Sequence, residues 1–309
     1  MTQPVLSRRF AITATLLGTS GLSMAASTQP HAQSAESATK VKVLAAHPVA
    51  HALTRRLIKG SAVVLERATP ESLPPTRHAA YFAGRGAASL SAAAESADAV
   101  VSLRSVWPED PLFPLARRAN IRIIEIDAAR PVDGALPGVA LLPGAPGEGQ
   151  HAWLDPTNLG RMADIVAHDL KLLAPDSAPR ISEQLAQFKQ EVVALTASAG
   201  TAMAMLEDVT VFSLSDRLDH FATGFNLDLF GRDHRDDTAW TTNALSAFSQ
   251  RLRDANVGAV LHHREPASEV ARGVSEGGAR LVVLSTAGVD PLAELAANVD
   301  RVVRGLTAT

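Results

Sequence analysis

The chain of 309 residues contains no cysteine. This absence excludes disulfide bonds, thiolate metal sites and an N-terminal cysteine that could carry a lipid anchor. Basic residues are not in excess either, because the formal net charge is −3 at pH 7. That balance gives no electrostatic footprint for nucleic acid and no polybasic patch for a membrane surface. The composition therefore favours a globular protein whose partners are neither nucleic acids nor anionic membranes.

The N-terminal segment lacks an apolar run long enough to cross a membrane. Arg8 and Arg9 precede a moderately apolar run over 10–26 that is diluted by Gly, Ser and Thr. This layout is typical of a secretory signal peptide, which we predict over 1–32; the arginine pair leaves ordinary secretion and twin-arginine export both open. Cleavage takes the formal charge from −3 to −5, because the leader carries two arginines and no acid. We expect a periplasmic protein without a lipid anchor or stable membrane insertion.

Short apolar segments of β character alternate with segments of helical periodicity along the rest of the chain. Such alternation predicts mostly parallel sheets covered by helices on both faces. The pattern restarts after a helix predicted over about 178–205, where apolar residues follow spacings of three and four. The predicted strands are 41–46, 62–66, 99–103, 121–126, 209–213, 225–230, 257–262 and 280–285.

Two doubly wound α/β lobes bridged by one long helix are therefore the predicted architecture. Residues 33–40 are small and polar and are predicted to form a linker. The N-terminal lobe is predicted over 41–177, the connecting helix over 178–205 and the C-terminal lobe over 206–309. We expect the protein to be a monomer.

The stretch HAWLDPTN, residues 151–158, combines a helix start with residues that a helix start does not require. Asp155 is predicted to be the N-cap, with Pro156 at the first helical position. These two residues account for the start of the helix but not for His151 or Trp153. From the residues alone, His151 is either a structural residue or a metal ligand.

The longer segment HAWLDPTNLGRMADIVAHDLKLLAPDSAP resembles the central motif of the zinc- and manganese-binding solute-binding proteins of ABC importers. In that family H-x-W-L-D-P-x-N opens a helix, and the resemblance extends over nearly the whole mature chain. It implies two α/β lobes bridged by a single long helix. It also implies a protein that is not an enzyme, captures a divalent metal, and delivers it to the membrane permease of an ABC importer. Zinc is the expected metal and manganese the alternative.

The family holds its metal with four side chains, two from each lobe. The resemblance implies His151 and His78 as the ligands of the N-terminal lobe. In the C-terminal lobe, the family's ligand positions fall on Ser215, which precedes Asp216, and on Ser285. Because a hydroxyl is a poorer zinc ligand than an imidazole or a carboxylate, two of the four expected ligands are missing.

Other histidines are candidates to complete the site. His262 and His263 end a predicted strand, and neighbouring strand residues point to opposite faces, so we expect at most one of them, His263, to face the cleft. His47 follows the first predicted strand, where parallel sheets present ligand-facing loops, although a capping or packing role is equally open. The predicted metal site is therefore His78 and His151 with His263 and His47, and with His262 or Asp216 as substitutes.

Two other functions remain open. A scaffold that has lost its metal site would bind no metal and would hold another small ligand or a partner protein, using Ser215 and Ser285 as hydrogen-bond donors. A hydrolase would require a motif such as G-x-S-x-G or H-E-x-x-H, and the sequence contains neither.

Overall fold

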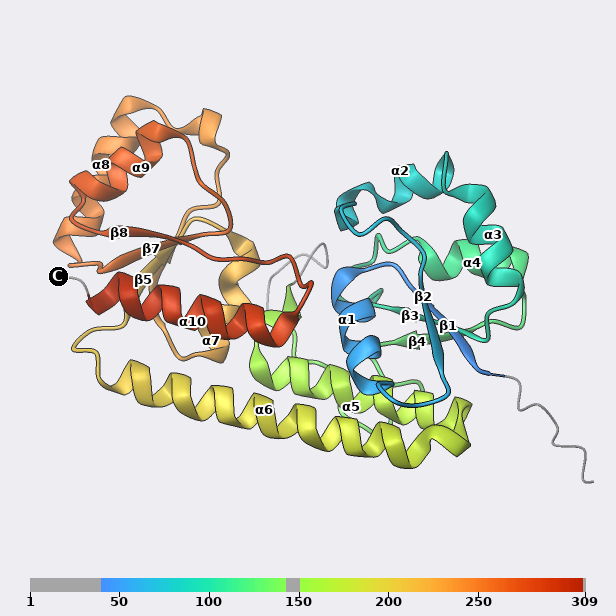
Figure 1. Cartoon of the computed structure of the whole chain (residues 1–309). Helices are drawn as coiled ribbons and strands as arrows, with labels where there is room; N and C mark the ends of the chain where they lie inside the picture. Colours follow the sequence, from blue (N-terminus) through green and yellow to red (C-terminus); the bar gives the residue numbers. More distant parts are fainter. Residues whose placement is uncertain (1–39, 143–150, 308–309) are drawn as a thin grey trace, which may run out of the picture. The chain divides into compact units, whose positions relative to one another are not determined.

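Two four-stranded parallel sheets form the framework of the computed structural model, which describes residues 40–142 and 151–307 (Figure 1). The strand order is β2-β1-β3-β4 in the first sheet and β6-β5-β7-β8 in the second. Both sheets therefore follow the same winding, and residues 40–309 make up one compact unit. The predicted signal peptide lies outside the described residues. The strands are β1 Lys42–Ala45, β2 Val64–Arg67, β3 Ala99–Ser102, β4 Ile124–Asp127, β5 Thr210–Ser213, β6 Asp228–Arg232, β7 Ala259–His262 and β8 Arg280–Val283.

Each of these strands overlaps one predicted segment, but β4 and β6 each begin three residues later than the pattern predicts. For β6 the reason lies in the end of the preceding helix. Asn226, with a φ of 55°, adopts the left-handed conformation that ends α7 (Asp219–Gly224). Leu227 donates its backbone N–H back to the carbonyl of Ala222 and is buried. The apolar residues before β6 thus close a helix end, a role that local hydrophobicity does not distinguish from a strand.

The long helix α6 (Ala178–Ala204) confirms the predicted connecting helix, with 27 residues. It contacts α1 and α5 of the N-terminal lobe, which contains the first sheet, and α10 of the C-terminal lobe, which contains the second (Figure 1). Its buried seam includes Ile181, Phe188 and Val192. The two-lobed α/β fold with one long helix is therefore confirmed. The other helices are α1 Pro48–Leu57, α2 His78–Ala83, α3 Ala87–Glu95, α4 Leu112–Ala119, α5 Pro156–Leu173, α8 Thr242–Asp254, α9 Ser268–Glu276 and α10 Pro291–Thr307.

The start of α5 confirms the predicted cap. The Asp155 carboxylate accepts the backbone N–H of Thr157 at 2.7 Å and that of Asn158 at 3.3 Å, while Pro156 occupies the first helical position. Both donors lack partners within the helix, so the cap fixes where the preceding turn meets α5. Trp153 lies in that turn, the 3₁₀ helix Ala152–Leu154, and is buried.

One hydrophobic core continues from the first sheet to the second. It includes Val101 of β3 and Leu261 of β7, together with Met162 of α5 and Phe188 of α6. Two smaller clusters cover the opposite faces of the sheets, because successive strand residues point to opposite sides. Within the described residues, no helix combines the length and apolarity needed to cross a membrane.

A buried carboxyl group lies at the start of α4. Asp110 is 3% exposed and accepts the backbone N–H of Leu112 at 3.1 Å and of Leu103 at 3.4 Å. Burial raises the pKa of Asp110 to about 6, and the two hydrogen bonds oppose that shift only in part. The unfolded chain therefore ionises this group at a lower pH than the folded protein does, and stability is lost as the pH rises through that interval.

The variant Asp110→Asn tests how much folding stability is lost when Asp110 ionises. An amide keeps an acceptor for Leu112 but does not ionise, so the variant should gain stability relative to wild type as the pH rises from 4 to 8. The expected change in relative free energy of unfolding is about 3 kcal/mol or less. Urea denaturation at several pH values measures it, with Asp290→Asn at the exposed cap of α10 as the control. A constant difference between wild type and Asp110→Asn across this range would contradict the prediction.

Candidate metal-binding site

The predicted histidines of the N-terminal lobe gather at the loops that follow the strands of the first sheet. His47 follows β1, His78 begins α2 after β2, and His151 precedes α5. Their side chains are only 2%, 2% and 5% exposed. His78 and His151 lie close enough to His47 for positive charge on either to lower its pKa. Parallel strands deliver their loops to one edge of a sheet, which explains the gathering.

Two tryptophans pack against two of these histidines. The centroid of the His47 ring lies 5.4 Å from that of Trp107 and 5.1 Å from that of Trp153. The corresponding distances from His151 are 5.7 Å and 4.6 Å. Sequence reasoning missed Trp107, although its place in the loop after β3 could have indicated it. The aromatic walls restrict how the two imidazoles can rotate.

His47 has the capping role that the sequence left open. Its Nδ1 accepts the backbone N–H of Val49 at 3.3 Å and so caps α1. An accepting Nδ1 places the proton of the neutral ring on Nε2. That Nε2 is buried and has no hydrogen-bond partner among the described residues. Metal binding through Nε2 would transfer the proton to Nδ1 and break the cap, so the role of His47 as a ligand remains a prediction.

His78 uses the opposite nitrogen. Its Nε2 lies 3.4 Å from the backbone carbonyl of Leu73, and because a carbonyl only accepts, Nε2 carries the proton. The lone pair of the neutral ring is therefore on Nδ1. Burial lowers the pKa of both His78 and His47 below the usual value. Both rings are neutral at pH 7, the form in which imidazole binds metals.

Ser215 and His263 meet at the end of the second sheet. Ser215 lies just beyond β5, His263 lies just beyond β7, and these strands are neighbours. The Ser215 Oγ is 2.7 Å from the His263 Nδ1. Burial, followed by the positive charge of Arg217, lowers the pKa of His263 to about 4. The C-terminal lobe thus presents a second neutral imidazole site.

His262 and Asp216, the other two candidate ligands of this region, differ in how exposed they are. His262 is 4% exposed, and its Nδ1 accepts the backbone N–H of Arg264 at 3.2 Å. His263 is half-buried, whereas Asp216 is exposed. The centroids of the His262 and His263 rings are only 4.8 Å apart, so the expectation that these side chains point to opposite faces is wrong. The reason is that β7 ends at His262, and the alternation of a strand no longer applies to His263.

Ser285 is bonded to a carboxylate that sequence reasoning missed. Its hydroxyl donates to Glu294 Oε2 at 2.6 Å, and the backbone N–H groups of Ala287 and Gly288 donate to the same carboxylate. Glu294 lies in the first turn of α10, where an acid can reach back to the preceding loop, and this position was the available signal. The carboxylate therefore holds the loop that follows β8.

The predicted ligands do not form one coordination site in this conformation. Across residues 40–142 and 151–307, no three or more His, Asp or Glu side chains are arranged to hold a metal ion. The N-terminal lobe contributes the group His47, His78 and His151, and the C-terminal lobe contributes the Ser215–His263 pair. Their assignment as ligands remains a prediction.

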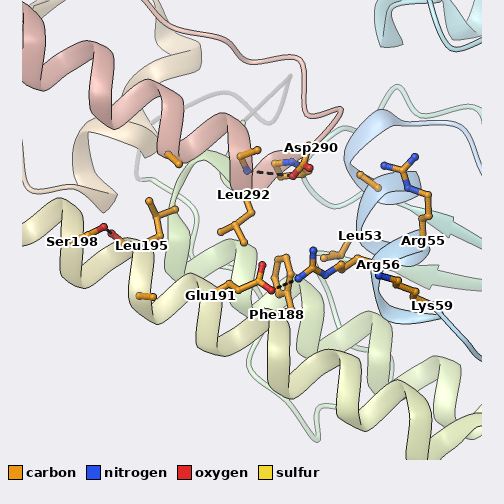
Figure 2. Close-up of a pocket in the computed structure, with 15 residues that line it drawn as sticks. Leu53, Arg55, Arg56, Lys59, Phe188, Glu191, Leu195, Ser198, Asp290 and Leu292 are labelled. Atoms are coloured by element: carbon orange, nitrogen blue, oxygen red, sulfur yellow. Dashed lines mark hydrogen bonds and ion pairs between the residues drawn. The ribbon is translucent and has the colours of Figure 1, made fainter.

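A separate groove lies between α1, α6 and α10, with a volume of about 970 Å³ (Figure 2). Leu53, Phe188 and Leu292 provide apolar walls, and none of the predicted ligands lines it. The ion pair between Arg56 and Glu191 joins α1 to α6 at this groove (Figure 2). The groove is thus distinct from both histidine groups.

Solved structures with the same fold are metal-binding proteins by their descriptions. The Zn(II)-bound ZnuA-like domain of Streptococcus pneumoniae AdcA is 14% identical, with a TM-score of 0.66, covering 86% of this chain and 99% of that one. A Mn-bound periplasmic metal-binding protein of Candidatus Liberibacter asiaticus is 13% identical, with a TM-score of 0.67 and coverages of 86% and 100%. FpvC of Pseudomonas aeruginosa, in complex with Ni²⁺, is 18% identical, with a TM-score of 0.63 and coverages of 86% and 97%.

Two parallel α/β lobes joined by a long helix thus form the fold that this chain shares with these solved structures. Residues 88–301 match the family described as "Zinc-uptake complex component A periplasmic", ZnuA, and the chain belongs to this family. It is a family of solute-binding proteins and not of enzymes, as predicted. No curated protein matches the chain.

Gly288 tests how the loop after β8 contacts the N-terminal lobe. Its φ is +68°, and a Cβ added there would overlap Cγ2 of Val49 in α1. Gly288→Ala should therefore lower the free energy of unfolding by roughly 2–4 kcal/mol, through backbone strain and overpacking. Gly278→Ala is the matched control, because its φ is +79° with nothing within 4 Å of the added Cβ. Equal losses for the two variants in urea denaturation would contradict the close contact.

Proposed function

We propose that this protein captures a divalent transition metal, zinc in preference to manganese, and delivers it to the permease of an ABC importer. His78 and His151 would bind the ion from the N-terminal lobe and His263 from the C-terminal lobe, with His47 as a further candidate ligand. The protein would act in the periplasm after cleavage of its signal peptide. Membership of the ZnuA family supports the cargo, the location and the partner.

The observation that carries the proposal is the group of buried histidines at the edge of the first sheet. An imidazole buried among aromatic rings loses hydration, and this loss lowers the pKa of His47. Its Nε2 has no hydrogen-bond partner among the described residues, an arrangement that costs free energy unless a ligand or water meets it. A metal would meet the Nε2 of His47 only by displacing its proton and the cap bond, whereas the lone pair on Nδ1 of neutral His78 is available without such a change.

The donor types support zinc over manganese. Zinc accepts imidazole nitrogen readily, whereas manganese is better served by carboxylate, carbonyl and water oxygens. Serines stand at both ligand positions that the resemblance implies for the C-terminal lobe, and Glu294 near one of them is occupied by the loop it holds. The ligand set proposed here is therefore rich in nitrogen.

Metal capture requires movement of the ligand-bearing segments. Because the described residues contain no preformed group of three ligands, the two histidine groups must close around the ion. Trp107 and Trp153 contact His47 and His151, so closure should change their fluorescence.

A second candidate function follows from the charge around His263. Arg217 and Arg264 both lie near enough to lower the pKa of His263, and the neighbouring ligand position holds a hydroxyl. Cationic and hydrogen-bonding groups favour an anionic small ligand over a bare cation. In this alternative, the scaffold has lost its metal site and binds such an anion.

Zinc titration of the chelator-treated protein separates the two functions. Zinc at 100 times its dissociation constant should stabilise the fold by about 2.7 kcal/mol and so raise Tm, with manganese giving a smaller shift. His151→Ala and His263→Ala should each reduce the zinc shift, because each removes a proposed nitrogen ligand.

His234→Ala is the control for His263→Ala, since it removes an exposed histidine of the same lobe that is not a proposed ligand, whereas the ring of His262 packs against that of His263. This control should leave the zinc-induced shift unchanged relative to its own metal-free Tm. Absence of any shift in wild type, together with no metal in elemental analysis of the purified protein, would refute metal capture.

A further inference from the structure

We propose that Ser215 is a positioning residue that holds the imidazole of His263 with its Nε2 toward the metal. This inference rests on the proposed function and extends it, because it gives a role to a hydroxyl that occupies a ligand position of the family. Ser215 would act through its 2.7 Å contact with His263 Nδ1 and would not bind the ion itself.

The backbone of Ser215 is held from both sides. The Ser213 hydroxyl donates to the Ser215 carbonyl at 2.8 Å and accepts the Ser215 backbone N–H at 3.3 Å. The Ser215 Oγ also accepts the backbone N–H of Arg217 at 3.3 Å, which caps the 3₁₀ helix Asp216–Leu218. Ser215 is 3% exposed. Its hydroxyl oxygen is therefore a fixed point in the fold.

The sheet brings His263 to that fixed point. Strands β5 and β7 pair in parallel, with Ser213 opposite Leu261. Ser215 and His263 each stand two residues beyond this pair, at the same edge of the sheet. A hydrogen bond from a fixed hydroxyl to one ring nitrogen sets the rotation of the imidazole and directs the other nitrogen away from Ser215.

The position of the ring proton distinguishes His263 from its neighbour, His262. The Nδ1 of His262 accepts the backbone N–H of Arg264, so in the neutral ring its Nε2 carries the proton and has no lone pair for a metal. The Nδ1 of His263 faces a hydroxyl, which can donate or accept. When a metal binds Nε2 of His263, the ring proton is on Nδ1. This N–H then donates a hydrogen bond to the Ser215 oxygen.

The Ser215 oxygen has the capacity for this second bond. A hydroxyl offers two lone pairs, of which one accepts the Arg217 N–H and the other can accept the His263 Nδ1–H. Partners of this kind, behind a metal-binding histidine, typically change metal affinity by about 10- to 100-fold when removed. Ser215 therefore orients a proposed ligand, His263, which lies just beyond the neighbouring strand β7.

A double-mutant cycle tests the inference on the full mature chain. Zinc affinity is measured by chelator competition for wild type, Ser215→Ala, His263→Ala and the double variant. Ser215→Ala should weaken binding by roughly 10- to 100-fold, whereas Ser215→Thr, which keeps the hydroxyl, should stay near wild type. In the His263→Ala background, Ser215→Ala should have no further effect, because the residue it positions is gone.

NMR of the protein with ¹⁵N-labelled histidine measures the chemical shifts of the His263 ring nitrogens. These shifts would stay unchanged in Ser215→Ala if Ser215 only stabilised the fold. In zinc-bound wild type, the His263 Nδ1 should be protonated and Nε2 should carry the metal shift, and Ser215→Ala should alter both signals. Circular dichroism confirms that each variant is folded.

Other outcomes would overturn the inference. An unchanged affinity in Ser215→Ala would remove the positioning role, and equal weakening in the His263→Ala background would make Ser215 a direct ligand. If wild type binds no zinc, the proposed function fails as a whole. In that case the ring nitrogen signals of metal-free Ser215→Ala still report whether Ser215 fixes the His263 ring, so the two failures are distinguishable.

Discussion

The continuous hydrophobic core between the two sheets is the constraint on which the other features depend. Residues of β3, α5, α6 and β7 belong to one buried cluster. Because apolar area in this cluster is removed from water jointly by both lobes, the strands of each sheet are held relative to the helices that they share. The loops that follow the strands are held in place for the same reason, and both histidine groups lie on such loops.

The two lobes contribute different chemistry to the loops. The N-terminal lobe offers imidazoles packed against tryptophans, and burial lowers the pKa of one of them, His47. The C-terminal lobe offers hydroxyls that are each bonded to a stronger metal-binding group, Ser215 to His263 and Ser285 to Glu294. Each of these two serine hydroxyls thus lies within one hydrogen bond of a side chain that can bind a metal, a histidine at Ser215 and a carboxylate at Ser285.

Local patterns were sufficient to predict the strands, the long helix and the cap at Asp155, because each depends on residues close in sequence. The late start of β6 arose where apolar residues close a helix end and Asn226 adopts the left-handed conformation. The site was harder to predict, since its contacts join distant residues. Ser215 and His263 are 48 positions apart, and the pairing depends on the strand order of the sheet. The capping bond of His47 likewise depends on a rotamer that spacing does not specify.

The last helix has a consequence for how the chain acquires its structure. Helix α10 (Pro291–Thr307) packs against α1, α5 and α6, so the final described residues complete contacts with the first helix of the N-terminal lobe. A chain that emerges N-terminus first cannot form these contacts until α10 has been synthesised. The N-terminal lobe therefore exposes part of its apolar surface until that point, and a nascent chain depends on long-range closure by α10 for part of its stability.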